Sequence, residues 1–132
     1  MANPENLLIN SVLATRDWRT VQDHGMDRRE FHDFKDEWLW LVEYVKRYGE
    51  LPSRGDFRAR FPDFVVPDED VSDVGRYCVE AIEWDARWRL IRYFDQGLEL
   101  LQDERVADAL ALVLQSQFDL GSFSASHPRS GR

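Results

Sequence analysis

The fold of this chain is decided by the stretch HDFKDEWLWLVEYVKRYG, residues 32–49. Its apolar side chains recur at intervals of four, three, four and three residues, the period of an α-helix: Phe34, Trp38, Leu41, Val45 and Tyr48. Gly49 is a typical helix terminator. Leu39, Trp40 and Val42 widen the apolar face beyond that of an ordinary surface helix. We therefore expect this helix to be central to its domain or to contact another chain.

The N-terminal segment has the features of a helix start. Asn3 suits an N-cap, Pro4 suits the first turn, and Glu5 places an acid at the positive end of the helix dipole. The apolar residues that follow at helical spacing are Leu7, Leu8, Val12 and Leu13. A short second helix is expected over residues 17–24.

The stretch GELPSRGDFRARFP, residues 49–62, contains the tripeptide Arg-Gly-Asp of adhesion ligands. Pro52 cannot continue the preceding helix, Ser53 suits an N-cap, and Asp56 resembles the acid of a capping box. We therefore expect a short helix whose first turn holds the tripeptide, and no adhesion function. The basic residues are expected to form its solvated face, with a nucleic-acid contact as the alternative: Arg54, Arg58 and Arg60.

Two long helical segments follow an acidic linker around residues 65–70. Apolar side chains continue at helical spacing from Val74 to Leu101, and again from residue 104 to about Phe118. A polar step separates the segments, and Asp103 suits the N-cap of the second. Two long helices joined by a short turn form an antiparallel hairpin.

The predicted fold is therefore all-α, with a small globular helical bundle followed by a long antiparallel helical hairpin. The predicted boundaries are 1–64 for the globule, 65–83 for the acidic linker and the start of the long helix, 84–119 for the hairpin, and 120–132 for a disordered tail. Together these segments make one domain.

Composition narrows the class of protein. Hydrophobic residues make up 43% of the chain, which indicates a folded protein. The single cysteine, Cys78, excludes an internal disulfide and is expected to be a small buried apolar residue. No apolar run approaches the ~20 residues that span a membrane, and no signal peptide is evident. We expect a cytoplasmic protein without a membrane segment.

The net charge of −8 is concentrated in residues 63–85, which carry eight acidic side chains and one basic. Because nucleic-acid affinity depends on Lys and Arg, we expect weak or no direct nucleic-acid binding. The acidic block is either a solvated loop or a docking surface for a basic partner. The partner-docking candidates are Trp40, Asp68, Glu69, Asp70 and Asp73.

Motifs of catalysis are missing from the sequence. It contains no GxxxxGK[ST] phosphate loop, no GxGxxG and no GxSxG. The three histidines are not spaced for a metal. We therefore expect that the chain by itself is no enzyme, and that it needs no cofactor or metal.

The order of elements resembles the N-terminal domain of DnaB-type replicative helicases, especially the divergent versions encoded by bacteriophages. The resemblance covers roughly residues 4–119. A Glu and a Leu-Leu pair in the first helix, a Phe opening the central helix, and a Gly-x-x-Pro-Ser step carry it: Glu5, Leu7, Leu8, Phe31 or Phe34, Gly49, Pro52 and Ser53.

The resemblance implies a non-catalytic interaction and oligomerisation domain in DNA replication. The family's domain assembles with copies of itself into a dimer-based or ring-shaped collar, and it docks DnaG-type primase or a helicase loader. Its ATPase motifs lie in a separate RecA-like domain. Two alternatives are a stand-alone phage protein that binds the helicase as loader or inhibitor, and a helicase-binding domain like that of primases.

The hairpin carries more apolar surface than two helices can bury against each other, and such surface usually marks an interface. The self-association candidates are Trp84, Trp88, Ile91, Phe94, Leu98, Leu101, Leu110, Val113, Leu114 and Phe118. The alternative is that these residues pack inward against the central helix, with Trp38 and Trp40.

Overall fold

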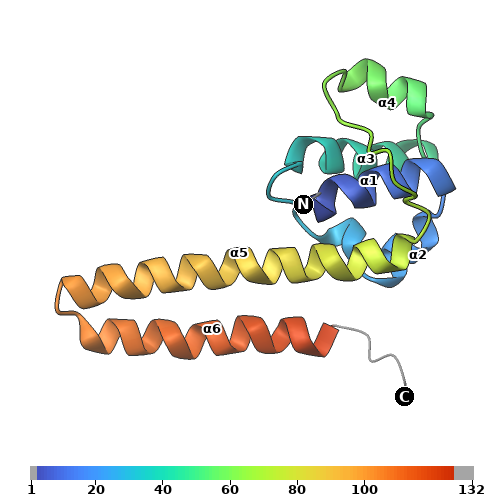
Figure 1. Cartoon of the computed structure of the whole chain (residues 1–132). Coiled ribbons are helices and arrows are strands. Elements are labelled where there is room, and N and C mark those ends of the chain that lie inside the picture. The colour runs from blue at the N-terminus through green and yellow to red at the C-terminus, as the bar shows by residue number, and fades with distance from the viewer. Residues whose placement is uncertain (1–2, 127–132) are drawn as a thin grey trace. The chain divides into compact units, whose positions relative to one another are not determined.

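A computed structural model describes residues 3–126, with side chains through residue 117 (Figure 1). Within residues 3–126 the chain forms six α-helices, one 3-10 turn and no strand, which confirms the all-α prediction. The elements are α1 (Pro4–Thr15), α2 (Trp18–Asp23), η1 (Met26–Arg28), α3 (Lys35–Tyr48), α4 (Arg54–Arg60), α5 (Val74–Gln102) and α6 (Val106–Ser126). Two compact units divide within α5, after Ala81.

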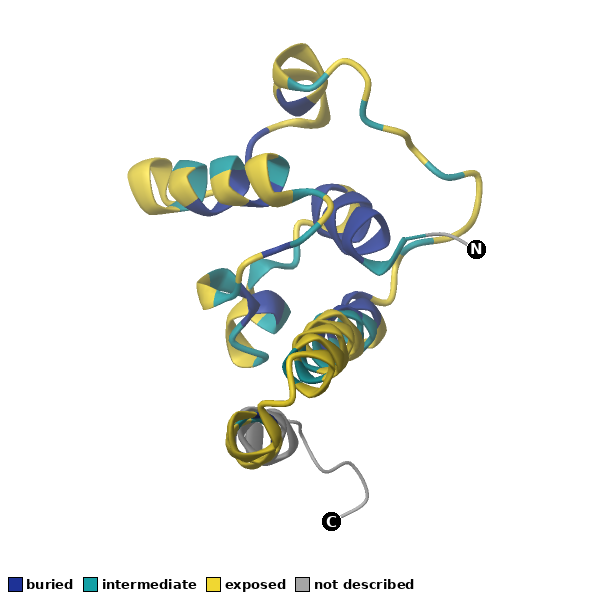
Figure 2. Ribbon diagram, turned by 90° about the vertical axis from the view of Figure 1, so that its left-hand side faces the viewer, coloured by how far each residue is buried: buried dark blue, intermediate teal, exposed yellow. Residues whose placement is uncertain are grey.

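The core of the first unit is built around α1. Its residues 5–13 are all buried, and Figure 2 shows this helix dark blue. In contrast, α3 buries only part of its surface: its apolar residues Leu39 and Tyr48 are more than half exposed. The helix at the centre of the unit is thus α1, whereas the width of the apolar face in residues 32–49 had suggested α3.

Glu5 connects α1 to the start of α3. Its carboxylate accepts hydrogen bonds from the backbone N–H groups of His32 at 2.8 Å, Asp33 at 2.8 Å and Phe34 at 3.0 Å. Phe34 occupies the N-cap of α3 and provides no capping side chain. The buried acid of α1 therefore satisfies amides at the N-terminus of α3 and complements its helix dipole.

Other polar side chains of α1 attach two loops to it. The amides of Asn6 and Asn10 donate to the Val65 carbonyl at 3.0 and 3.1 Å. The Arg16 guanidinium, just after the helix, donates to the carbonyls of Leu51 and Pro52. These bonds fix the loop before α4 and the segment after it to one helix.

The short helix α4 forms as its sequence predicts. Ser53 is the N-cap, and its Oγ accepts from the Asp56 N–H at 3.0 Å. The Arg-Gly-Asp tripeptide lies in the first turn, and Phe57 is buried. This confirms that the tripeptide belongs to a helix rather than to a loop tip.

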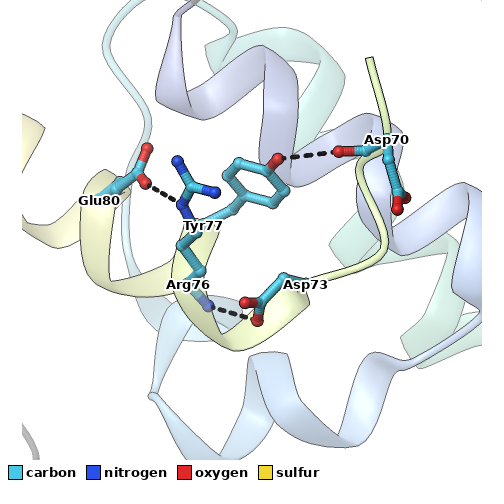
Figure 3. A network of polar contacts seen from close by, with 5 residues as sticks. All are labelled: Asp70, Asp73, Arg76, Tyr77 and Glu80. Atoms are coloured by element: carbon cyan, nitrogen blue, oxygen red, sulfur yellow. Dashed lines mark hydrogen bonds and ion pairs between the residues drawn. The ribbon is translucent and has the colours of Figure 1, made fainter.

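The start of α5 is held by the polar network in Figure 3. Asp73 Oδ1 accepts from the Arg76 N–H at 3.1 Å, and Arg76 Nε donates to Glu80 at 2.9 Å. The Tyr77 hydroxyl donates to the Asp70 carbonyl at 3.3 Å. The first two turns of α5 therefore belong firmly to the first unit, with Tyr77 buried.

Cys78 lies in these turns and is completely buried, as the sequence predicts. Burial raises the pKa of its thiol to about 12, and the charge of Asp17 adds to the shift. Since the thiolate is the reactive form, we expect Ellman's reagent at pH 8 to modify the folded protein roughly 1,000-fold more slowly than the urea-unfolded chain. Equal rates in the two states would show that the thiol is accessible.

The turn of the hairpin differs from the prediction. The N–H of Glu104, at a left-handed φ of 58°, donates to the Leu101 carbonyl, and the Arg105 N–H donates to Leu100. This pair of bonds is a Schellman motif, which closes a helix C-terminus. Asp103 thus caps the end of α5, and the prediction that it caps the next helix is wrong.

The second long helix is longer than expected. It begins at Val106 and continues to Ser126, beyond the predicted end near Phe118. Residues 120–126, predicted to lie in a disordered tail, are therefore helical. No proline interrupts the helix before Pro128. The rest of the predicted tail, residues 127–132, lies outside the described residues.

Candidate functional site

The two arms of the hairpin face each other along a seam of half-buried side chains. On α5 these recur at the coiled-coil intervals of four and three residues, and they are Ala86, Leu90, Tyr93, Gly97 and Leu100. The seam residues of α6 are Ala109, Leu112 and Ser116. Leu100 and Leu112 line one cavity of about 370 Å³ beside the turn. The seam thus combines large apolar side chains such as Leu90 and Leu112 with small residues such as Gly97 and Ala109.

One side of the hairpin is apolar. Six residues that each follow a seam residue by one position form this apolar face: Ile91, Phe94, Leu98, Leu101, Leu110 and Val113. In an antiparallel pair, residues with the same offset from the seam lie on the same side of both helices. The two rows therefore make one continuous surface, although every member is 46–65% exposed.

The opposite side is polar. The residues that precede seam residues by one position are Asp85, Arg89, Arg92, Gln96, Glu99, Asp108, Ala111 and Gln115. Asp85 and Arg89 form an ion pair at 3.2 Å. The hairpin is thus amphipathic as a pair of helices, because polar residues occupy one side and large apolar residues the other. Most of both sides is exposed, as the yellow ribbon of the long helices shows (Figure 2).

Most of the predicted self-association residues are exposed on the hairpin. The six residues of the apolar face all belong to the prediction, and Trp88 and Leu114 beside them are 39% and 62% exposed. Trp84 is half-buried, with the Arg87 guanidinium 5.6 Å from the centre of its ring. The Phe118 side chain lies outside the described residues.

The tryptophans offered as inward packing partners are engaged within the first unit. Trp38 is buried and stacks on Phe31, with ring centres 4.3 Å apart. Its Nε1 donates to the Met26 carbonyl at 3.0 Å. Trp40 packs against Phe57 and Phe61 of the α4 region, at 5.9 and 5.8 Å.

The partner-docking candidates do not form one cluster. Trp40 is half-buried between α3 and α4, whereas the four acids are exposed in the segment before α5. Asp73 caps α5, and Asp70 Oδ1 accepts from the Ser72 N–H at 3.0 Å. Asp68 and Glu69 remain as exposed carboxylates of this segment. The apolar face of the hairpin is therefore the better candidate for an interaction site.

Comparison of the chain with protein-family models, curated proteins and solved structures finds no match. Within residues 3–126, no helix is long and apolar enough to cross a membrane. In the same part of the chain, no group of three or more His, Cys, Asp or Glu side chains is placed to hold a metal ion.

Proposed function

We propose that this chain is a protein–protein interaction and self-association domain that works as the N-terminal domain of a DnaB-like replicative helicase. The observation that carries the proposal is the apolar face of the hairpin. Large exposed apolar patches mark interaction sites in soluble proteins, and aromatic residues such as Phe94 are frequent anchors in them.

A second copy of the chain is the partner that fits this face best. The face contains no charged residue, so two copies can meet there despite a net charge of −8. A two-fold interface places the same patch on both subunits, which requires only self-complementary apolar surface. The charged side of each hairpin then stays in water.

The assignment to DNA replication is supported by the resemblance described above. The all-α globule and the following hairpin have the architecture that the resemblance implies. In this proposal a DnaG-type primase or a loader docks on the assembled domain in the cytoplasm, and ATP hydrolysis belongs to a separate domain. Calorimetric titration with the helicase-binding domain of a DnaG-type primase tests this assignment, and it fails if no such primase binds.

Self-association is tested by co-expressing two copies with different affinity tags. We expect purification through one tag to recover the other copy in comparable amount. A copy with Leu98→Gln and Leu110→Gln serves as the matched negative control. Recovery of the second copy to the same extent with this variant would place the contact elsewhere.

Nucleic acid is expected to be a poor ligand. Because basic side chains are outnumbered by acids, 17 to 25, binding of single- or double-stranded DNA should remain weak even at ~50 mM salt, where phosphate contacts are lightly screened. Fluorescence anisotropy of labelled oligonucleotides measures this. A tight complex that weakens steeply with added salt would contradict the expectation.

A further inference from the structure

A cavity of about 260 Å³ opens in the first unit beside α4. Its lining comes from α1, from α4 and from the segment that follows: Asn10, Leu13, Arg54, Gly55, Phe57, Arg58, Phe61, Phe64 and Val66. None of its residues belongs to the hairpin, so the cavity is separate from the apolar face.

Three phenylalanines give the cavity an aromatic wall. Phe57 lies 5.1 Å from Phe61 and 5.0 Å from Phe64, measured between ring centres. Phe57 is buried, while Phe61 and Phe64 are half-buried. Such a wall accepts an apolar or aromatic side chain, since aromatic pairs gain free energy beyond the area they bury.

Two arginines give the cavity a positive rim. Arg54 and Arg58 are one helical turn apart, both line the cavity, and no acidic residue lines it with them. No ion pair joins either guanidinium to a carboxylate within residues 3–117. In a chain with eight more acids than bases, two uncompensated arginines at one cavity favour an anionic ligand.

We propose that this cavity is a docking site for an acidic peptide segment that inserts one apolar or aromatic side chain. The inserted side chain would contact the phenylalanines, and neighbouring carboxylates would form charge-assisted hydrogen bonds with Arg54 and Arg58. The volume suits one large side chain and is smaller than most pockets for drug-sized ligands. The partner is therefore a linear motif on another protein.

The surrounding charge favours a peptide over a nucleic acid. The chain leaving the cavity carries Asp63 and the exposed acids Asp68, Glu69 and Asp70. The lining offers two basic residues, which are too few to neutralise the run of phosphates that supplies most nucleic-acid affinity. A short peptide needs only one anchoring side chain and a carboxylate or two beside it.

The test uses isotope-labelled full-length chain and a capped peptide with three acidic residues on each side of one tryptophan. We expect the peptide, added to ~2 mM in an NMR titration, to shift the amide signals of α4 and of Asn10 and Leu13, with an affinity in the millimolar range or better. Arg54→Glu with Arg58→Glu should weaken binding at least ~10-fold, because attraction becomes repulsion.

The matched control is Lys46→Glu. Lys46 is an exposed base on α3 and does not line the cavity. We expect this variant to keep its affinity within ~3-fold, since a charge outside the site acts through screening solvent. Arg54, Arg58 and Lys46 are all exposed, so the variants should stay folded, which their NMR spectra report directly.

Several outcomes would overturn the proposal. These are an absence of shifts at the cavity, shifts confined to the hairpin, or equal binding of a peptide with serine in place of the tryptophan. Tighter binding of an eight-nucleotide oligothymidine than of the peptide would assign the site to nucleic acid instead. The cavity and the apolar face share no residue, so an absence of binding at the cavity leaves the self-association measurements unaffected.

Discussion

Replacing Leu98 and Leu110 by glutamine is expected to convert a self-associating protein into a monomer. Both side chains lie on the apolar face, 58% and 61% exposed. A two-fold interface contains each substituted position twice, so four apolar contacts are lost together. We expect the dissociation constant of the dimer to rise at least ~100-fold, which analytical ultracentrifugation measures.

The control for this variant is Leu39→Gln. Leu39 is as exposed as the two hairpin leucines, at 55%, but lies on α3 in the first unit. Substitution there should leave the dissociation constant within ~2-fold, since surface changes away from an interface have small effects. If Leu39→Gln dissociated the protein as strongly as the hairpin variant, the contact would not be specific to the hairpin.

Glu5→Ala is expected to cause the largest loss of folding stability. The carboxylate is 2% exposed and accepts from three backbone N–H groups. These three hydrogen bonds to a charged group are part-buried, and each is worth ~1.5–3 kcal/mol, so we expect the free energy of unfolding to fall by about 3–5 kcal/mol. Urea titration followed by tryptophan fluorescence measures this loss, because Trp38 is buried near the start of α3.

Two further variants show whether the hydrogen bonds are responsible. Glu5→Gln keeps the size of the side chain and one accepting oxygen, and we expect an intermediate loss of ~1–3 kcal/mol. Glu50→Ala removes an exposed acid and should change stability by less than ~0.5 kcal/mol. A loss below ~1 kcal/mol for Glu5→Ala would mean that water or another group replaces the carboxylate.

The sequence predicts the helices well because their signals are local. The apolar period, the cap at Ser53 and the stop at Gly49 all lie within a few residues of the elements that they define. The central position of α1 is not local. Its buried polar residues find their hydrogen-bond partners far along the chain, 27–29 residues away for Glu5 and 55 residues away for Asn10. No local sequence pattern reveals these partners.

The hairpin shows a second limit of sequence patterns. The large apolar residues are recognisable in the sequence, but hydrophobicity alone does not divide them between the seam and the exposed side. The structure places residues such as Leu90 and Leu112 in the seam and leaves Phe94 and Leu98 exposed, a division that depends on how the two arms face each other. The prediction that Asp103 begins the second helix was wrong because Glu104 adopts a left-handed conformation, which is usually found at glycine.

The cavity beside α4 also depends on distant segments. Arg54 and Arg58 were expected to form a solvated face, with a nucleic-acid contact as the alternative, because nothing adjacent in sequence indicates a peptide ligand. Their place in the lining of a cavity depends on the folded structure, in which α1 supplies Asn10 and Leu13. The i to i+4 spacing of Arg54 with Arg58 and of Phe57 with Phe61 was the one available signal.

Self-association through the hairpin is tested most directly by the mass of the unmodified chain in solution. Multi-angle light scattering at ~100 µM should give at least twice the monomer mass of 15.6 kDa. A functional interface should have a dissociation constant well below ~100 µM, so the protein should be associated at this concentration. The mass should fall toward the monomer on dilution and in the Leu98→Gln, Leu110→Gln variant. A mass of 15.6 kDa for the wild type at ~100 µM would contradict self-association of this domain.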